Sequence, residues 1–200
     1  VSPANDLIPN SLIHFKSNKV FAVTFNDGQN SWATSKFTFG FIQYGNGSPK
    51  VLHSSFWASG GAGLFKKSTW DSLGGFDPIF SPGYFEDQDI GLRAHKAGFE
   101  IIWDPECKIT HSSPGSTFTK SYAQKDLTHI KERNYLLLHW KNLDYTNLLI
   151  HFFFLLLKDI IHPGFIAPTL RALALVTKLH RSKSLVSDEV MFSKFTSHAQ

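Results

Sequence analysis

The chain has 200 residues, 42% of them hydrophobic, which suits one ordinary domain, or one domain with an appendage, and allows a sizeable core. Its single cysteine, Cys107, excludes a disulfide framework within the chain and fits a reducing compartment, and no secretory signal pattern opens the sequence. The formal net charge of +4 falls entirely within residues 121–200 and favours an anionic surface as a partner, while no signature of a nucleic-acid-binding module appears.

The first part of the chain predicts strands and helices in alternation. Residues 1–19 indicate a leading loop and a short helix. Residues 20–25 are apolar and β-branched, which predicts a buried strand, and the polar residues 26–31 predict a turn. A hairpin is expected to pair residues 36–44 with residues 51–59. This order of elements is typical of an α/β domain, and we expect its sheet to be mixed.

The next part predicts a strand, a short helix and a loop. Residues 59–65 indicate a strand that is reached through glycines, and residues 67–75 indicate the helix. Ser68 is expected to cap this helix, and Gly74 is expected to end it in the left-handed conformation. Residues 76–85 predict the loop.

A second helix and two extended pieces follow. The helix is expected over residues 86–97, where Gly98 ends it. Residues 99–103 predict a strand, which Pro105 should interrupt, and residues 107–111 predict a second extended piece.

Three carboxylates crowd the start of this helix: Glu86, Asp87 and Asp89. Favourable interaction with the helix dipole, about 0.3–1 kcal/mol each, explains a single acid there but not a cluster. Asp89 stands four residues before Arg93, so we expect an ion pair, and Glu86 is expected to cap or orient the turn. Asp87 stands four residues before Gly91, which would leave room above it for a substrate. A carboxylate at a helix N-terminus stays ionised at neutral pH, as a general base must be.

These residues belong to a longer pattern over residues 57–111. It comprises a small-residue stretch, Gly-Gly-Phe-Asp, an acidic pair, Asp-x-x-x-Arg, Ala-Gly and a strand that ends in His. The pattern resembles the C-terminal half of the catalytic domain of family 2 glycosyltransferases, in the rhamnosyltransferase-like branch, with a weaker likeness over 1–25 and 120–142. The resemblance implies a GT-A mixed sheet over residues 1–120, followed by a helical region over residues 121–200.

The resemblance also implies roles for single residues. Asp87 matches the catalytic base, which would deprotonate an acceptor hydroxyl while that oxygen attacks the anomeric carbon with inversion. His111 matches a metal ligand. The residues implied or expected to bind substrate or acceptor are Trp57, Gly60, Gly61, Glu86 and Asp89.

The partners follow from the same resemblance. They are a nucleotide-sugar donor, a glycan or lipid-linked acceptor of cell-surface polysaccharide synthesis, and a divalent metal, Mn2+ or Mg2+. The Asp-x-Asp motif that supplies the main metal ligands in the family precedes the segment with which this chain starts. We therefore expect a fragment that lacks the nucleotide-binding half and is inactive alone.

The C-terminal region predicts helices over most of residues 121–180. Its most apolar stretch, residues 147–181, is interrupted too often for a spanning helix, which needs about 20 apolar residues. It predicts either two interfacial helices joined at Pro163-Gly164 or two helices packed on the core. The positive charge favours the interfacial arrangement, so we expect a cytoplasmic protein that is peripheral on the inner face of the cell membrane.

Two other classes of function remain open from the residues. One is a non-catalytic carbohydrate- or membrane-binding module derived from the same fold. The other is a glycosidase with paired carboxylates. The glycosidase is least favoured because Glu86 and Asp87 are adjacent on one helix and point about 100° apart.

Overall fold

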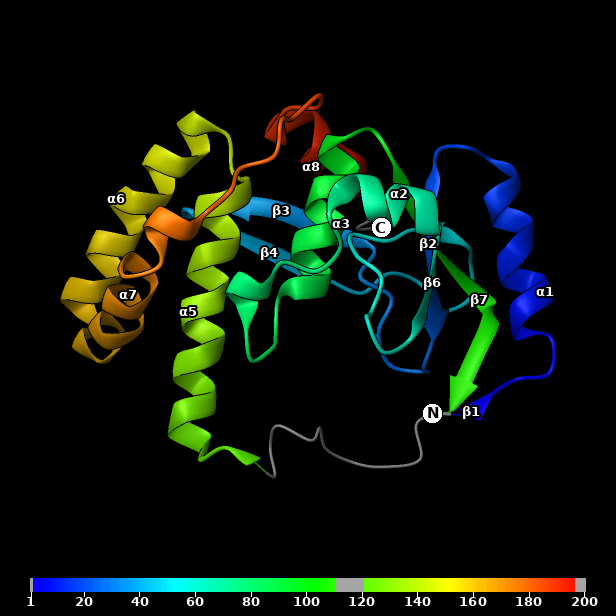
Figure 1. The fold of residues 1–200 in the computed structure, drawn as a ribbon, viewed down its shortest axis with the longest axis horizontal. Coiled ribbons are helices and arrows are strands. Elements are labelled where there is room, and N and C mark those ends of the chain that lie inside the picture. The colour runs from blue at the N-terminus through cyan, green and yellow to red at the C-terminus, as the bar shows by residue number, and fades with distance from the viewer. Residues whose placement is uncertain (1, 111–120, 197–200) are drawn as a thin grey trace.

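The computed structural model of the protein describes residues 2–110 and 121–196 (Figure 1). A five-stranded sheet has the order β1–β7–β2–β6, and β5 pairs with β7. Strands β2 and β7 are parallel and the other pairs are antiparallel, so the predicted mixed sheet is confirmed. The strands are β1 (Ser2–Pro3), β2 (Val20–Asn26), β5 (His53–Ser54), β6 (Gly63–Phe65) and β7 (Glu100–Thr110).

Helices cover both faces of the central strands (Figure 1). On one face lies α1 (Leu7–Leu12), which continues as the 3-10 helix η1 (Ile13–Lys16), and its Leu7 packs with Val23 of β2 in a buried cluster. On the other face lies α3 (Glu86–Lys96), and its Ile90 packs with Phe21 of β2. Both faces of β2 are therefore buried, which agrees with its near-continuous apolar sequence.

A hairpin does form, but residues 36–44, which were expected to be one of its strands, contribute to both strands. It pairs β3 (Thr34–Thr38) with β4 (Phe41–Gly45) as a separate two-stranded sheet. Phe39 and Gly40 make the turn with φ of +50° and +76°. Such a turn needs positive φ at both central residues, and Phe is an unusual choice for the first. The predicted pairing with residues 51–59 is therefore wrong, because the alternating pattern runs through the turn without a recognisable break.

Strand β7 is one continuous strand, so the predicted interruption at Pro105 is wrong. The proline nevertheless lies in a bulge. Phe25 of β2 pairs with Asp104, whereas the next residue, Asn26, pairs with Lys108, so residues 105–107 are extra on β7. A bulge accommodates a residue that cannot donate a ladder hydrogen bond without ending the strand.

For the short helix α2 (Lys67–Leu73), the predicted C-terminal end is confirmed and the predicted N-terminal cap is wrong. Ser68 lies inside the helix instead of capping it; Lys66 precedes the first turn and makes no side-chain cap. Gly74 ends the helix in the left-handed conformation at φ of +82°, as predicted. The 3-10 helix η2 (Pro78–Phe80) forms within the predicted loop.

The C-terminal helices share the largest hydrophobic cluster with the first part of the chain. Ile42 of the hairpin and Leu92 of α3 belong to the same cluster as Leu137 and Phe192. The predicted boundary at residue 120 falls outside the described residues. The helices are α5 (Gln124–Asn142), α6 (Tyr145–Ile161), η3 (Pro163–Phe165), α7 (Ile166–Leu173), η4 (Val176–Lys178) and α8 (Asp188–Thr196).

Candidate active site

A cleft of about 700 Å³ opens at the C-terminal end of β2. Strand β2 ends at the cleft because the polar turn that follows Asn26 cannot continue a buried strand. The remaining lining comes from the segment between β2 and β3, the hairpin, the glycine-containing loop before β6, the start of α3 and Lys131 of α5. The lining includes Thr24, Asp27, Trp32, Tyr44, Trp57, Gly61, Tyr84, Glu86, Asp87 and Lys131.

An unusual backbone brings Asp87 into this cleft. Tyr84 and Phe85, directly before α3, both have a left-handed backbone, with φ of +74° and +75°. A non-glycine residue in that conformation costs about 1–3 kcal/mol and persists only when its surroundings hold it. Asn134 of α5 stabilises this conformation. Its side-chain Nδ2 lies 2.7 Å from the Phe80 carbonyl oxygen, 2.9 Å from that of Gly83 and 3.0 Å from that of Tyr84.

The carboxylate of Asp87 is a stronger base than its position at a helix N-terminus suggests. Burial, and to a smaller extent the adjacent negative charge of Glu86, raise its pKa from 3.8 to about 6. Backbone N–H groups oppose this shift, among them Gln88 N, which donates to Oδ1 at 2.8 Å, and Gly60 N, which donates to Oδ2 at 3.5 Å. With a pKa of about 6 the group is still mostly ionised at pH 7, in a ratio of roughly ten to one.

Glu86 lines the cleft, and one oxygen of its carboxylate accepts no hydrogen bond from the described residues. Its Oε2 atom is buried and has no hydrogen-bond partner among the described residues. Of its two predicted roles, capping is wrong because Phe85 occupies the N-cap position and Glu86 is the first residue of α3, while the orienting role stays a prediction. A buried carboxylate oxygen without a partner is unfavourable, so a small shift of this side chain that lets the oxygen meet a hydroxyl group would be favourable.

Asp89 lies behind the cleft and not in its lining. It is fully buried, and the predicted ion pair with Arg93 forms at 2.8 Å from Nε to Oδ2. Lys141 Nζ lies 2.8 Å from the same oxygen, and Asn142 Nδ2 donates to Oδ1 at 2.8 Å. A direct contact with an acceptor does not fit this burial, so the role of Asp89 is to fix α3 to α5.

The space over Gly91 does not belong to a substrate, so that prediction is wrong. A Cβ atom at Gly91 would lie 2.8 Å from Trp57 Cβ and 2.9 Å from the Phe56 carbonyl oxygen. Gly91 instead lets α3 approach the segment that carries Trp57. The Trp57 ring stacks on Trp32 with centroids 4.2 Å apart, and the Tyr44 ring meets it edge-on at 4.8 Å.

The predicted site residues Trp57, Gly60, Gly61 and Glu86 do gather around Asp87. Gly61 lines the cleft, and a Cβ there would meet nothing within 4 Å. Gly60 reaches Asp87 through its backbone N–H, as described above, and a Cβ at this residue would press on the Phe76 ring at 3.0 Å. Both glycines therefore leave the approach to the carboxylate open.

Several lining residues were not anticipated. Asp27 follows the end of β2, and its Oδ1 accepts hydrogen bonds from the backbone N–H groups of Gln29 and Asn30, both at 2.9 Å. Its place directly after a buried strand is the signal that could have revealed it. Lys131 of α5 holds its ammonium 4.5 Å from the centre of the Tyr84 ring and brings a positive charge to the cleft. No sequence pattern marks Lys131, because its helix is distant along the chain.

The described cleft residues do not form a metal site by themselves. Within residues 2–110 and 121–196, a single group of three potential ligands comes together, and it contains His14, Asp104 and Cys107, none of which lines the cleft. The predicted ligand His111 lies outside the described residues.

Comparison with known proteins gives a partial likeness to glycosyltransferases. No family model matches the chain. It is 36% identical over 61 residues to the N-acetylglucosaminyl-diphospho-decaprenol L-rhamnosyltransferase of Mycobacterium tuberculosis, in strain CDC 1551 / Oshkosh and in strain ATCC 25618 / H37Rv. This match spans 30% of the chain and only 20% of each relative's length.

A solved structure shares the fold. The crystal structure of GalNAc-T7 with UDP, GalNAc and Mn2+ matches with a TM-score of 0.51 at 12% identity, over 70% of this chain and 29% of that one. GalNAc-T7 is a GT-A glycosyltransferase, so the mixed sheet and its covering helices represent part of a GT-A fold.

Proposed function

We propose that these residues form the acceptor side and the catalytic base of an inverting glycosyltransferase, of the rhamnosyltransferase-like branch of family 2. The reaction would move a sugar from a nucleotide-diphosphate donor to a glycan or lipid-linked acceptor in cell-surface polysaccharide synthesis. The observation that carries the proposal is Asp87, a carboxylate with a pKa of about 6 beside the aromatic wall of a cleft. The likeness to a rhamnosyltransferase and to a UDP-binding GT-A structure supports it.

In the proposed reaction, Asp87 takes the proton of the acceptor hydroxyl as its oxygen attacks the anomeric carbon. A new carbon–oxygen bond forms on one face of the sugar, the bond to the diphosphate breaks on the other, and the configuration inverts. A base with a pKa near the working pH is well matched to this transfer. The partly exposed ring of Trp32, which stacks on the buried ring of Trp57, offers a stacking surface for the acceptor sugar, and Glu86 offers its carboxylate to a second hydroxyl.

The leaving diphosphate needs positive charge near it. Among the described cleft residues, Lys131 is the cation suited to this contact. The family resemblance implies a divalent ion, Mn2+ or Mg2+, and GalNAc-T7 was crystallised with Mn2+. The described cleft residues do not gather its ligands, so no step above depends on it.

The pH dependence of transfer tests the base directly. Below its pKa, Asp87 is protonated and cannot accept a proton, so kcat/KM is expected to rise with pH and level off above about 6. An aspartate without the burial shift would place this limb near 4. The measurement is sugar transfer between about pH 4.5 and 8 by the natural full-length protein that contains these residues, with folding checked at each pH. A rate that is flat across this range would exclude Asp87 as the titrating base.

We further propose that α6 and α7 hold the protein on the inner face of the cytoplasmic membrane. They lie at the end of the molecule beyond α5 (Figure 1). One side of α6 packs into the structure through His151 and Leu155, while its other side is apolar and exposed. This apolar face comprises Leu149, Phe153, Leu156 and Ile160 of α6 with Ile166, Leu170 and Leu173 of α7, all between 42% and 68% exposed.

An exposed apolar face made of these seven large side chains marks an interaction site. In the part of the chain described, no helix is long and apolar enough to cross a bilayer alone. Helices Tyr145–Ile161 and Pro163–Leu173 meet the length and composition test only as a pair, with a bend of 117°. Shallow insertion of both helices agrees with that bend, and the exposed Arg171 and Lys178 can reach anionic headgroups.

Vesicle co-sedimentation tests the membrane proposal. The double variant Phe153→Glu/Leu156→Glu is expected to bind anionic vesicles at least about tenfold more weakly, because each apolar side chain contributes about 1.5–3 kcal/mol when buried. Added salt should also weaken binding by the wild type. The matched control is Leu185→Glu, which adds a charge at a residue 73% exposed outside the apolar face and should bind normally. A wild-type protein that stays in the supernatant at low salt would refute the proposal.

A further inference from the structure

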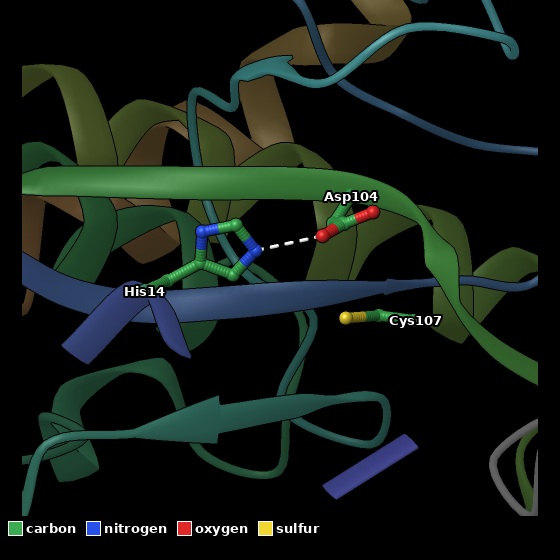
Figure 2. A group of neighbouring side chains, drawn as sticks. All are labelled: His14, Asp104 and Cys107. Carbon is green, nitrogen blue, oxygen red and sulfur yellow. Dashed lines mark hydrogen bonds and ion pairs between the residues drawn. The ribbon is translucent and has the colours of Figure 1, made fainter. Parts of the chain in front are cut away.

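A group of three buried or nearly buried side chains comes together between η1 and β7 (Figure 2). It contains His14 of η1 with Asp104 and Cys107 of β7, and one potential ligand atom from each lies within 4.8 Å of the others. His14 Nε2 is 2.7 Å from Asp104 Oδ2. The group shares no residue with the lining of the cleft.

The bulge in β7 creates this group. In a regular strand, residues three apart face opposite sides of the sheet, so Asp104 and Cys107 would point away from each other. The three extra residues, 105–107, change the alternation, and both side chains then turn towards His14. Both are also buried, Asp104 at 7% and Cys107 at 0% exposure. Bulges of this kind frequently redirect side chains at functional sites.

Neighbouring groups hold the three side chains in place. Asp104 Oδ1 accepts a hydrogen bond from the Glu106 backbone N–H at 2.8 Å, which leaves Oδ2 directed at His14. The Ser11 hydroxyl of α1 lies 3.3 Å from the Cys107 sulfur and can rotate its proton towards a thiolate. Outer contacts of this type orient the ligands of protein metal sites. The His14 side chain is 13% exposed, so an ion has a way in from the surface.

We propose that His14, Asp104 and Cys107 bind a zinc ion. Sulfur, imidazole nitrogen and carboxylate oxygen are the ligands that Zn2+ takes, whereas Mg2+ and Mn2+ prefer oxygen alone. Tetrahedral bonds of about 2.0–2.3 Å separate ligand atoms by roughly 3.3–3.8 Å, so shifts below about 1 Å would form the site, with water as the fourth ligand. The thiol of Cys107 loses its proton to solvent as the sulfur–zinc bond forms. The ion would join η1 to the bulge of β7, a structural role independent of the glycosyl transfer proposed above.

Cobalt substitution gives a direct test because Cys107 is the single thiol of the chain. The metal-free protein, kept reduced, is titrated with Co2+ and then with Zn2+. We expect a thiolate-to-cobalt charge-transfer band at one equivalent and its loss when zinc displaces cobalt. Zinc at about 100 times its Kd should also raise the Tm by roughly 5–10 °C. Cobalt uptake without the thiolate band would mean binding by other histidines only and would overturn the proposal.

Two variants and a control separate a metal site from ordinary packing. Cys107→Ser should abolish the charge-transfer band, and His14→Gln should weaken zinc binding by about tenfold or more. His180→Gln removes an exposed histidine elsewhere and should leave the band and the affinity unchanged. Unfolding temperatures without metal are measured first, because His14→Gln also breaks the 2.7 Å contact with Asp104, and the test is the rise in Tm that zinc adds, which the wild type should show and Cys107→Ser should lack. A Cys107→Ser variant that binds zinc as tightly as the wild type would show that the three side chains form a hydrogen-bonded cluster without a metal.

Discussion

Replacing Asp87 with Asn is expected to lower the turnover of sugar transfer by about 10²–10⁴-fold. The amide keeps the shape of the carboxylate, and its single oxygen can still accept the 2.8 Å hydrogen bond from Gln88 N, while the longer contact with Gly60 N is lost, and it cannot take the acceptor proton. Binding of the donor should change little, because the substitution does not alter the contacts available to a nucleotide. The measurement compares kcat with the affinity for nucleotide sugars in the natural full-length protein. Near-normal turnover would remove Asp87 from the mechanism, and retained glycan binding without any transfer by the wild type would favour a non-catalytic module.

The same substitution should stabilise the fold. The pKa of Asp87 is 3.8 when unfolded and about 6 when folded, so between these values the folded state holds more protons and stability falls as pH rises. At pH 7 the ionised group then costs at most about 3 kcal/mol, and less where solvent screens it. Asp87→Asn removes that cost and should unfold at a higher urea concentration at pH 7 but not at pH 4. Lost activity together with raised stability excludes misfolding as the cause.

Replacing Asp89 with Asn is expected to have the opposite outcome, a loss of about 3–5 kcal/mol in the free energy of unfolding. Asp89 is fully buried, and the change leaves the charges of Arg93 and Lys141, only 5% and 3% exposed, without their shared carboxylate. Urea unfolding measures the loss. The matched control is Asp71→Asn, because Asp71 pairs with Lys67 at the same four-residue spacing but both side chains are more than half exposed.

The control should change stability by less than about 0.5 kcal/mol, since solvent screens an exposed pair. A loss in Asp89→Asn as small as in the control would mean that the buried amide keeps enough hydrogen bonds to hold both cations. The difference in the free energy of unfolding between the two variants therefore measures how much burial increases the stabilisation by an ion pair of four-residue spacing.

The features that could be predicted from the sequence depend on neighbours along the chain. The buried strand that became β2, the helix start at Glu86, the left-handed Gly74 and the pair of Asp89 with Arg93 all follow from residue type and spacing within one or two turns. The fold class followed from the order of such elements. The role of Asp87 came from a family resemblance, because the spacing alone also fits a plain helix start.

The features that could not be predicted depend on contacts distant along the chain. Gly91 stands at the right spacing to leave room for a substrate, but the same glycine also allows α3 to approach Trp57, and only the packing distinguishes the two. The shifted pKa of Asp87 arises from burial by several segments. Likewise, Lys131 reaches the cleft because α5 crosses beside the loop that carries Tyr84. The hairpin was missed because Phe39 takes a conformation that its residue type disfavours.

Through the three contacts of Asn134, the C-terminal helices help to position the proposed base Asp87. They hold the left-handed residues Tyr84 and Phe85, which set where α3 begins and so where Asp87 points. These helices are thus not an interchangeable module, and a chimera that takes them from a relative without an equivalent of Asn134 would be expected to misplace the Asp87 carboxylate. The exposed apolar side of α6 and α7 can therefore vary without moving Asp87 only if α5 keeps the contacts of Asn134 with that loop.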